Sequence, residues 1–219
     1  MRFIKWHLCI VGVAFFGIAA LSEAFEIKLK QEKIAEVAEY GKKYKGKEIS
    51  DLKVEDRAKM GLFMSFQSPL SLNGVNIYQL LRFALDKKKD PLAIRQSVQK
   101  YAKKLKIAEE LLTRSLNENF SGGEKKKMEV MQAVMLDPDL LFFDEIDTGV
   151  DIDALRTIAS FLKQMKAKDK TFVLITHYNR ILKYIKPDGV LILKNGKLVK
   201  SGTHKLADKI EKEGYEIIS

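Results

Sequence analysis

The most constraining feature of the sequence is a short apolar run that ends in two acids, Leu-Leu-Phe-Phe-Asp-Glu at 140–145. A continuous apolar run of this length is typical of a β-strand buried on both faces of a parallel sheet. Ligands of such sheets bind beyond the carboxyl ends of the strands, so both carboxylates are expected in a functional site. Asp144 would hold Mg²⁺ through water, and Glu145 would polarise an attacking water as general base.

Apolar runs and helical periodicities alternate along the chain after residue 47, which indicates a layered α/β fold. Besides the run at 140–143, strands are predicted at 60–67, 171–176, 190–193 and 197–200. The last two flank Asn195-Gly196 and predict a β-hairpin. Helices are predicted at 77–86, 92–115, 123–136 and 152–166.

A second motif, Phe-Ser-Gly-Gly-Glu at 120–124, opens one of these helices. Backbone N–H groups and the helix dipole converge at such a start, which suits a phosphate group. The alternative is a plain N-cap, in which Glu124 completes a capping box with Ser121. The motif alone leaves both interpretations open.

Three further polar residues follow strands or begin a helix, namely Gln67, Asp151 and His177. A Gln at a strand end can sense Mg²⁺ and the attacking water, and a His there can hydrogen-bond a γ-phosphate. A lone Gln is uninformative, and a lone His is more often a satisfied core or surface residue. The order Gln67, 121–124, 144–145, Asp151 and His177 is highly specific.

In this order the residues resemble the ATP-binding-cassette (ABC) ATPases. Their Q-loop, signature, Walker B strand, D-loop and H-loop match Gln67, 120–124, 140–145, Asp151 and His177. The residues resemble most closely the SufC-type ATPases of the SUF iron–sulfur cluster assembly system. The segments that carry this resemblance are 61–69, 117–127, 143–155 and 175–178. The resemblance covers about residues 46–219.

The resemblance implies a P-loop NTPase fold with a helical subdomain at about 77–120 and a C-terminal β-hairpin. It implies ATP and Mg²⁺ as ligands and SufB- and SufD-like scaffold proteins as partners. A dimer with an intact ATPase subunit is a further implication. The implied catalytic residues are Glu145 and His177, and Asp144 and Gln67 would contact Mg²⁺ through water. The implied nucleotide-binding residues are Gln67, Ser121, Gly122, Gly123, Glu124 and Asp151.

One element of that family is missing from the sequence, the phosphate-binding motif Gly-x-x-x-x-Gly-Lys-Ser/Thr known as Walker A. The run from Gly41 to Lys47 imitates it, but Glu48 follows and no apolar strand precedes it, so we reject it. We expect an incomplete P-loop NTPase domain at 46–219, with a gap in its sheet and negligible ATP hydrolysis of its own. The alternatives are a non-catalytic scaffold-binding module and a truncated gene model of an intact ATPase.

Residues 1–24 have the layout of a secretory signal peptide, with Arg2 and Lys5 before an apolar run at 8–21 and small residues at 22–24. An uncleaved anchor and a buried helix are the alternatives. Residues 25–45 are interpreted as a basic linker or transit-like segment, with a short helix near 26–40. These features predict a plastid of the apicoplast type as the location, and the alternative is cytoplasmic.

The net charge of +10 permits contact with nucleic acid or anionic lipid. Because acidic residues are interspersed among the basic ones, we interpret the charge as a solvated surface and expect no nucleic-acid partner. Membrane contact is expected only through residues 1–24. Cys9 is the only cysteine, so a cysteine-held metal cluster in the body of the chain is excluded.

Overall fold

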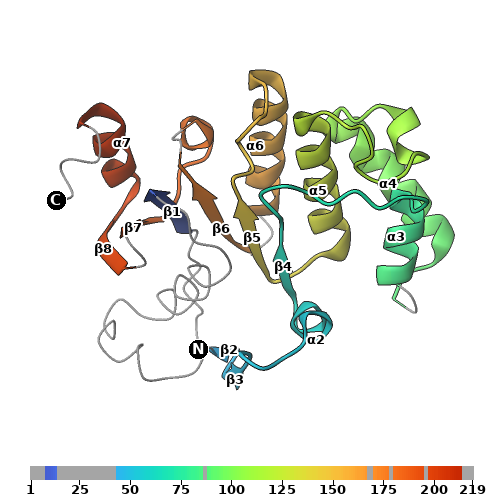
Figure 1. The fold of residues 1–219 in the computed structure, drawn as a ribbon, viewed down its shortest axis with the longest axis horizontal. Helices are drawn as coiled ribbons and strands as arrows, with labels where there is room; N and C mark the ends of the chain where they lie inside the picture. Colours follow the sequence, from blue (N-terminus) through green and yellow to red (C-terminus); the bar gives the residue numbers. More distant parts are fainter. Residues whose placement is uncertain are drawn as a thin grey trace.

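The computed structural model describes residues 8–13, 43–85, 88–166, 170–177, 180–194 and 197–213. These residues contain a six-stranded sheet in the order β4-β5-β6-β1-β7-β8 (Figure 1). Neighbouring strands are parallel except β8, which is antiparallel to β7. The strands are β1 Leu8–Val13, β4 Leu62–Met64, β5 Leu140–Asp144, β6 Thr171–Thr176, β7 Gly189–Lys194 and β8 Lys197–Gly202. The predicted α/β class and the C-terminal hairpin are thus confirmed.

The helices are α2 Val54–Lys59, α3 Ile77–Ala84, α4 Pro91–Leu105, α5 Gly122–Leu136, α6 Ile152–Lys166 and α7 His204–Glu213, with 3₁₀ turns η1 Glu109–Leu112 and η2 Ile181–Lys183. In Figure 1, α3 and α4 lie beyond α5, on the side away from β7 and β8. The prediction of one helix over 92–115 was wrong. Lys106 adopts a left-handed conformation with φ 53°, which ends α4, and buried Leu111 and Leu112 continue in η1.

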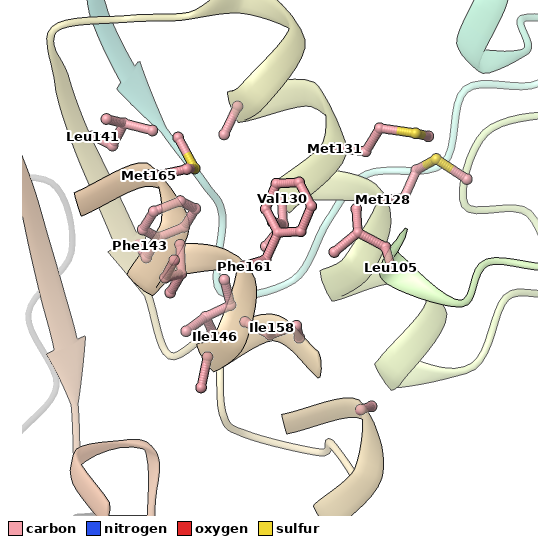
Figure 2. Packing of buried hydrophobic residues seen from close by; sticks show 14 of the residues in the cluster. Leu105, Met128, Val130, Met131, Leu141, Phe143, Ile146, Ile158, Phe161 and Met165 are labelled. Atoms are coloured by element: carbon pink, nitrogen blue, oxygen red, sulfur yellow. The ribbon is translucent and has the colours of Figure 1, made fainter. Parts of the chain in front are cut away.

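β5 is buried on both faces, as its apolar run predicts. Leu141 and Phe143 pack with α5 and α6 in the larger core cluster, part of which is shown in Figure 2. Leu140 and Phe142 point to the opposite face, where they pack in a smaller cluster with Ile49. This alternation is the two-residue period of a strand. Asp144 and Glu145 follow directly at the carboxyl end of the strand.

β1 comes from the run that we interpreted as the core of a signal peptide. Its backbone pairs with β6 on one side, with Leu8 opposite Val173, and with β7 on the other, with Leu8 opposite Gly189. The gap that we expected in the sheet is therefore occupied. Short apolar runs suit a strand and a signal peptide equally well, so the sequence alone could not separate them. Targeting by residues 1–24 stays a prediction.

The helix expected near 26–40 lies outside the described residues. The described part of the basic segment is a small antiparallel hairpin, β2 Lys43–Tyr44 and β3 Lys47–Glu48. Its turn residues Lys45 and Gly46 have φ values of 51° and 78°. Within the parts of the chain that the structure describes, no helix is long and apolar enough to cross a membrane.

A proline at the centre of β1 tests whether this strand is part of the folded sheet. An internal strand uses its N–H groups in the ladders on both sides, and proline has none to donate. We expect Ile10→Pro to lower the free energy of unfolding by about 2–3 kcal/mol. The measurements are urea denaturation and amide hydrogen exchange of β6 and β7.

The matched control is Ile10→Val, which keeps the N–H group and the β-branched shape, so both ladders stay complete and the expected change is much smaller. An Ile10→Pro chain as stable as the wild type, with unchanged exchange in β6 and β7, would show that residues 8–13 lie outside the folded sheet.

Candidate functional site

Glu145 is the centre of the site, and it lies directly after β5. Its N–H group donates to the Ile175 carbonyl over 2.8 Å, and its φ of 45° turns the chain sharply away from the sheet. Nε2 of Gln67 donates to Oε2 of Glu145 over 3.0 Å, and Nε2 of His177 lies 2.9 Å from Oε1. Three residues predicted separately from the sequence thus meet at one carboxylate.

Glu145 adopts a backbone conformation that is rare for residues with a side chain. Left-handed φ values in such residues carry strain of about 1–2 kcal/mol and persist only where the surroundings hold them. Here the Ile175 carbonyl, Gln67 and His177 all hold the residue. Its carboxylate is therefore fixed at the carboxyl edge of the sheet.

Asp144 is half-buried beside Glu145, and its N–H group donates to Oγ of Ser65 over 3.2 Å. Burial, together with repulsion by Glu145, raises the pKa of the Asp144 carboxyl above its usual range. A bound cation would oppose that rise. Mg²⁺ is usually held by one or two carboxylates together with waters and substrate phosphates.

The donor set therefore fits Mg²⁺ delivered with a nucleotide, which the Asp144 carboxylate would hold through water. Among the described residues, no group of three or more His, Cys, Asp or Glu side chains could hold a metal. A metal cage made by the protein alone is therefore not formed in this part of the chain.

The motif at 121–124 forms the capping box at the start of α5. The Glu124 carboxylate accepts from the Ser121 N–H over 2.7 Å, and Ser121 Oγ accepts from the Glu124 N–H. These bonds to Ser121 lower the pKa of Glu124 below its usual range. The capping interpretation is confirmed, and the phosphate-binding role of the motif stays a prediction.

The glycines of this motif lie against the loop that follows β5. A Cβ atom at Gly122 would lie 2.6 Å from the Gly149 carbonyl oxygen, and one at Gly123 would lie 3.3 Å from Cβ of Ala154. Contacts under 3.0 Å are not tolerated by real side chains, so position 122 requires glycine here. The start of α5 and the loop at 147–151 are thus packed backbone to backbone.

Asp151 begins α6 rather than joining the Glu145 cluster. Its Oδ1 accepts from the Ala154 N–H over 2.8 Å, as an N-cap side chain does. That bond lowers the pKa of Asp151. The predicted nucleotide-binding role of Asp151 stays a prediction.

Lys126 and Glu129 of α5 are part of the site, and the sequence did not reveal them. The Lys126 ammonium donates to the carbonyls of Phe66 over 2.8 Å and Gln67 over 2.9 Å, and its third contact is the Asp144 carbonyl at 3.4 Å. Oε1 of Glu129 accepts from the Phe66 N–H over 3.0 Å. The two side chains bind the loop of Gln67 to α5.

This pair is almost completely buried, which shapes its electrostatics. Burial lowers the pKa of Lys126 and raises that of Glu129, and the attraction between the two charges opposes both shifts. Nζ of Lys126 lies 3.6 Å from Oε2 of Glu129, too long for a hydrogen bond, so that oxygen has an ion-pair partner only. Each charge depends on the other, because an unpaired buried charge is strongly unfavourable.

Two cross-links join the loop after β5 to the loop after β6. Oγ1 of Thr176 donates to the Asp147 carboxylate, 2.9 Å from each oxygen, and both residues are buried. Burial raises the pKa of Asp147, while the Thr176 bond opposes the rise. Nη2 of Arg180 donates to the Val150 carbonyl over 3.0 Å. The loop at 147–151 is therefore hydrogen-bonded to Thr176, which precedes His177 in the sequence, and to Arg180, which follows it.

Comparison with known proteins decides what this arrangement is. The family model described as "ABC transporter" matches residues 26–148. A probable ATP-dependent transporter SufC of Escherichia coli is 41% identical over 180 residues, which span 78% of this chain and 73% of the relative. A probable ATP-dependent transporter ycf16 of Cyanophora paradoxa is 39% identical over 181 residues, 79% of this chain and 70% of the relative.

The chain belongs to the ABC transporter ATP-binding family. Solved ATP-binding cassettes share its fold. A nucleotide-free cassette from an ABC transporter superposes with a TM-score of 0.70 at 21% identity, over 98% of this chain and 87% of the other. A dimeric cassette, MJ0796 bound to ADP and Pi, superposes with a TM-score of 0.70 at 16% identity, over 93% and 88%.

Gln67 and His177, which the sequence resemblance predicts as the Q-loop and H-loop residues, both contact Glu145, the predicted Walker B glutamate. The signature at 121–124 instead contacts the D-loop, through Gly149. Lys126 connects these groups, since it begins one turn inside α5 and ends at the Q-loop carbonyls.

Removing the Lys126 ammonium tests this connection. We expect Lys126→Met to lower the free energy of unfolding by about 3–5 kcal/mol, because Glu129 then stays buried without its partner. The control is Lys127→Met. Lys127 is less buried and makes one long contact of 3.3 Å with the Lys106 carbonyl, so a change of about 0.5 kcal/mol is expected. Equal effects of the two substitutions in chemical denaturation would contradict the buried pair.

Proposed function

We propose that this ABC protein is a SufC-like ATPase subunit of iron–sulfur cluster assembly whose own ATP hydrolysis is defective. The observation that carries the ATPase part is the Glu145 carboxylate, fixed between Gln67 and His177 beyond β5. The SufC-like part is supported by 41% identity to a protein named SufC.

The site residues divide the chemistry among them. In a site with an intact phosphate-binding motif, Glu145 would accept a proton from a water that it orients, His177 would hydrogen-bond the terminal phosphate, and Gln67 would report on the occupancy of the site. Asp144 would hold Mg²⁺ through water. That ion supplies charge neutralisation to the phosphates when it is bound with ATP.

The proposed defect rests on the phosphate-binding motif. The sequence contains no complete Gly-x-x-x-x-Gly-Lys-Ser/Thr. The described part of the imitation at 41–47 lies in the β2–β3 hairpin, and the Lys45 ammonium pairs with Asp139. Without the motif, the β- and γ-phosphates lack the Lys and most of the backbone donors that grip them in this class of enzyme.

The signature residues, by contrast, are all present. A signature helix start can complete the ATP site of a second subunit, so we propose that this chain dimerises with an intact ATPase. In such a dimer, ATP binds in the partner's site against Ser121, Gly122 and Gly123 of this chain.

Scaffold proteins of the SufB and SufD type are the proposed partners. The docking surface would be the region around Gln67 and the helices after it, where Phe66, Leu70 and Phe83 expose 52%, 68% and 85% of their surface. Large exposed apolar side chains of this kind can take part in interaction sites. Residence in a plastid of the apicoplast type, reached through a signal in residues 1–24, is part of the proposal and has only the sequence pattern behind it.

The dimer proposal predicts that hydrolysis in the mixed dimer depends on Ser121 of this chain and does not depend on its Glu145. When this chain is mixed with an intact SufC-type ATPase, we expect the rate of ATP hydrolysis to rise above that of the intact ATPase alone. Ser121→Asp should reduce this increase at least about tenfold, because a carboxylate then faces the γ-phosphate. Glu145→Gln should leave this increase unchanged, since the chain's own ATP site does not hydrolyse ATP. The measurement is phosphate release at saturating Mg·ATP.

Ser121→Asn is the matched control, because Asn, Asp and Ser cap helices about equally well and Asn brings no charge. The chain alone should show no turnover above background. Turnover by the isolated chain that Glu145→Gln abolishes would disprove the defect. Equal rates with Asp and Asn at position 121 would disprove the shared site.

Scaffold docking is tested by Phe83→Ser with a purified complex of SufB- and SufD-like proteins. We expect this substitution to weaken binding at least about tenfold, because a large aromatic side chain is lost from the contact. Val54→Ser is the control, since Val54 is 78% exposed on α2, outside the helices that follow Gln67. Binding measured by calorimetry that is equal for both variants would place the scaffold elsewhere.

A further inference from the structure

The loop after β4 is hydrogen-bonded to the segment that leads into α5. The Leu72 N–H group donates to the Leu116 carbonyl over 3.0 Å, and the Leu116 N–H group donates to the Val75 carbonyl over 2.9 Å. The Gly74 N–H group donates to Oγ of Ser115 over 3.0 Å. Two segments that are distant in the sequence therefore lie side by side and form a short antiparallel bridge.

Asn117 extends this bridge with its side chain and its backbone. Its Nδ2 donates to the Leu70 carbonyl over 2.9 Å, and its own carbonyl accepts from Oγ of Ser71 over 3.0 Å. Asn117 exposes only 3% of its surface, so its bond to Leu70 is shielded from water.

Asn117 occupies this position at a cost in free energy. Its φ of 61° is left-handed, a conformation that asparagine tolerates better than most residues with a side chain. Its Oδ1 is buried and has no hydrogen-bond partner among the residues that the structure describes, which is unfavourable for an acceptor. A glycine would avoid both costs, so what asparagine adds here is the bond to Leu70. Costs of this kind persist where the surroundings hold them, and they cluster at functional sites.

The same loop is attached to α5 on the other side of the predicted signature. Lys126 donates to the carbonyls of Phe66 and Gln67. Residues 121–124 therefore lie between two attachment points, Asn117 before them and Lys126 after them, and both points attach to one loop. A displacement of that loop would act on the signature from both ends.

The first turn of α5 has little side-chain packing of its own. Ser121 and Gly122 are exposed, and the buried apolar side chains of α5 begin only at Met128. The backbone contact of Gly122 with Gly149 supports this turn. The direction in which the chain enters the turn therefore bears on where the Ser121 hydroxyl lies.

We propose that Asn117 is a positioning residue, which holds the signature where it meets the nucleotide of a partner subunit. This inference rests on the proposed function, because the site that Ser121 completes is the partner's. Asn117 acts through the backbone between it and Ser121, and its own side chain stays on the loop after β4.

The test removes the side chain and keeps the backbone conformation. Glycine adopts a left-handed φ readily, so Asn117→Gly deletes the bond to Leu70 and retains the turn. Asn119→Gly is the matched control. Asn119 also has a left-handed φ, of 56°, but it is exposed, and its side chain has no hydrogen-bond partner among the described residues.

The first measurement is amide hydrogen exchange in the full chain alone. The N–H groups of Glu124 and Lys125 both donate to Ser121, so their exchange reports on the position of the signature. We expect Asn117→Gly to speed this exchange about fivefold, as the loss of one hydrogen bond allows, and Asn119→Gly to leave it unchanged.

Exchange at Leu72 and Gly74 provides the comparison, since their N–H groups donate across the bridge. Faster exchange of Asn117→Gly at these two positions alone would show that Asn117 only fastens the loop, and it would overturn the inference. Equal effects of the two glycine substitutions on the first turn of α5, or no effect there, would overturn it as well.

The second measurement is ATP hydrolysis by the mixture with an intact SufC-type ATPase, as a function of the concentration of this chain. We expect Asn117→Gly to lower the maximal increase in rate about fivefold, because Ser121 is then misplaced against the γ-phosphate. A chain that is only less stable would reach the wild-type maximum at a higher concentration. That result would overturn the inference, and Asn119→Gly should follow the wild type throughout.

The two measurements separate this inference from the proposed function. If the wild-type chain gives no increase in hydrolysis, the proposed dimer is wrong, and the exchange result still decides whether Asn117 positions the signature. If Asn117→Gly does not fold, Ser71→Ala takes its place, since it removes the hydroxyl that donates to the Asn117 carbonyl. It should speed exchange in the first turn of α5 about twofold, and unchanged exchange there would then overturn the inference.

Discussion

The hydrogen-bond ladders on the two sides of β1 join the halves of the sheet. β4, β5 and β6 lie on one side of it and β7 and β8 on the other, and β6 and β7 are not paired with each other. Because β1 is parallel to both β6 and β7, its register fixes how far the carboxyl end of one of these strands is offset from that of the other. This ladder fixes β7 and β8 relative to β6, whereas Gln67, Glu145 and His177 follow β4, β5 and β6, which pair directly with one another.

Beyond that edge, buried polar groups hold the loops in place. Lys126 holds the two Q-loop carbonyls, and Asp147 holds Thr176 beside the H-loop residue. Burying such groups contributes little net stability, because desolvation offsets most of the attraction. Their effect is positional. A loop that moved would leave an ammonium or a carboxylate buried without a partner, so the site keeps one arrangement.

The sequence predicted those parts whose pattern is local and strong. β5 and β6 were found because their apolar runs are bounded by polar residues. α5 was found because its start has the pattern of a capping box and Asp137-Pro138 follows its end. The meeting of Gln67, Glu145 and His177 followed from motif order. β1 was not predicted as a strand because its pairing partners lie more than 150 residues further along the chain.

Lys126 was missed for a different reason. It stands in a run of three lysines, a pattern typical of a solvated surface, and its burial depends on backbone carbonyls that come close only after folding. The left-handed Lys106 that ends α4 also has no sequence signal, because glycine is the usual residue at such an end. Both errors concern residues whose environment is made by distant segments.

The tight approach of Gly122 to Gly149 has a consequence for how this chain can change over generations. A mutation that adds any side chain at 122 must displace the Gly149 carbonyl, and Gly149 itself holds a φ of 69° that other residues rarely adopt. Selection for a folded product is therefore enough to preserve this glycine. Its presence in a descendant would record packing, even in a lineage that no longer turned over nucleotide.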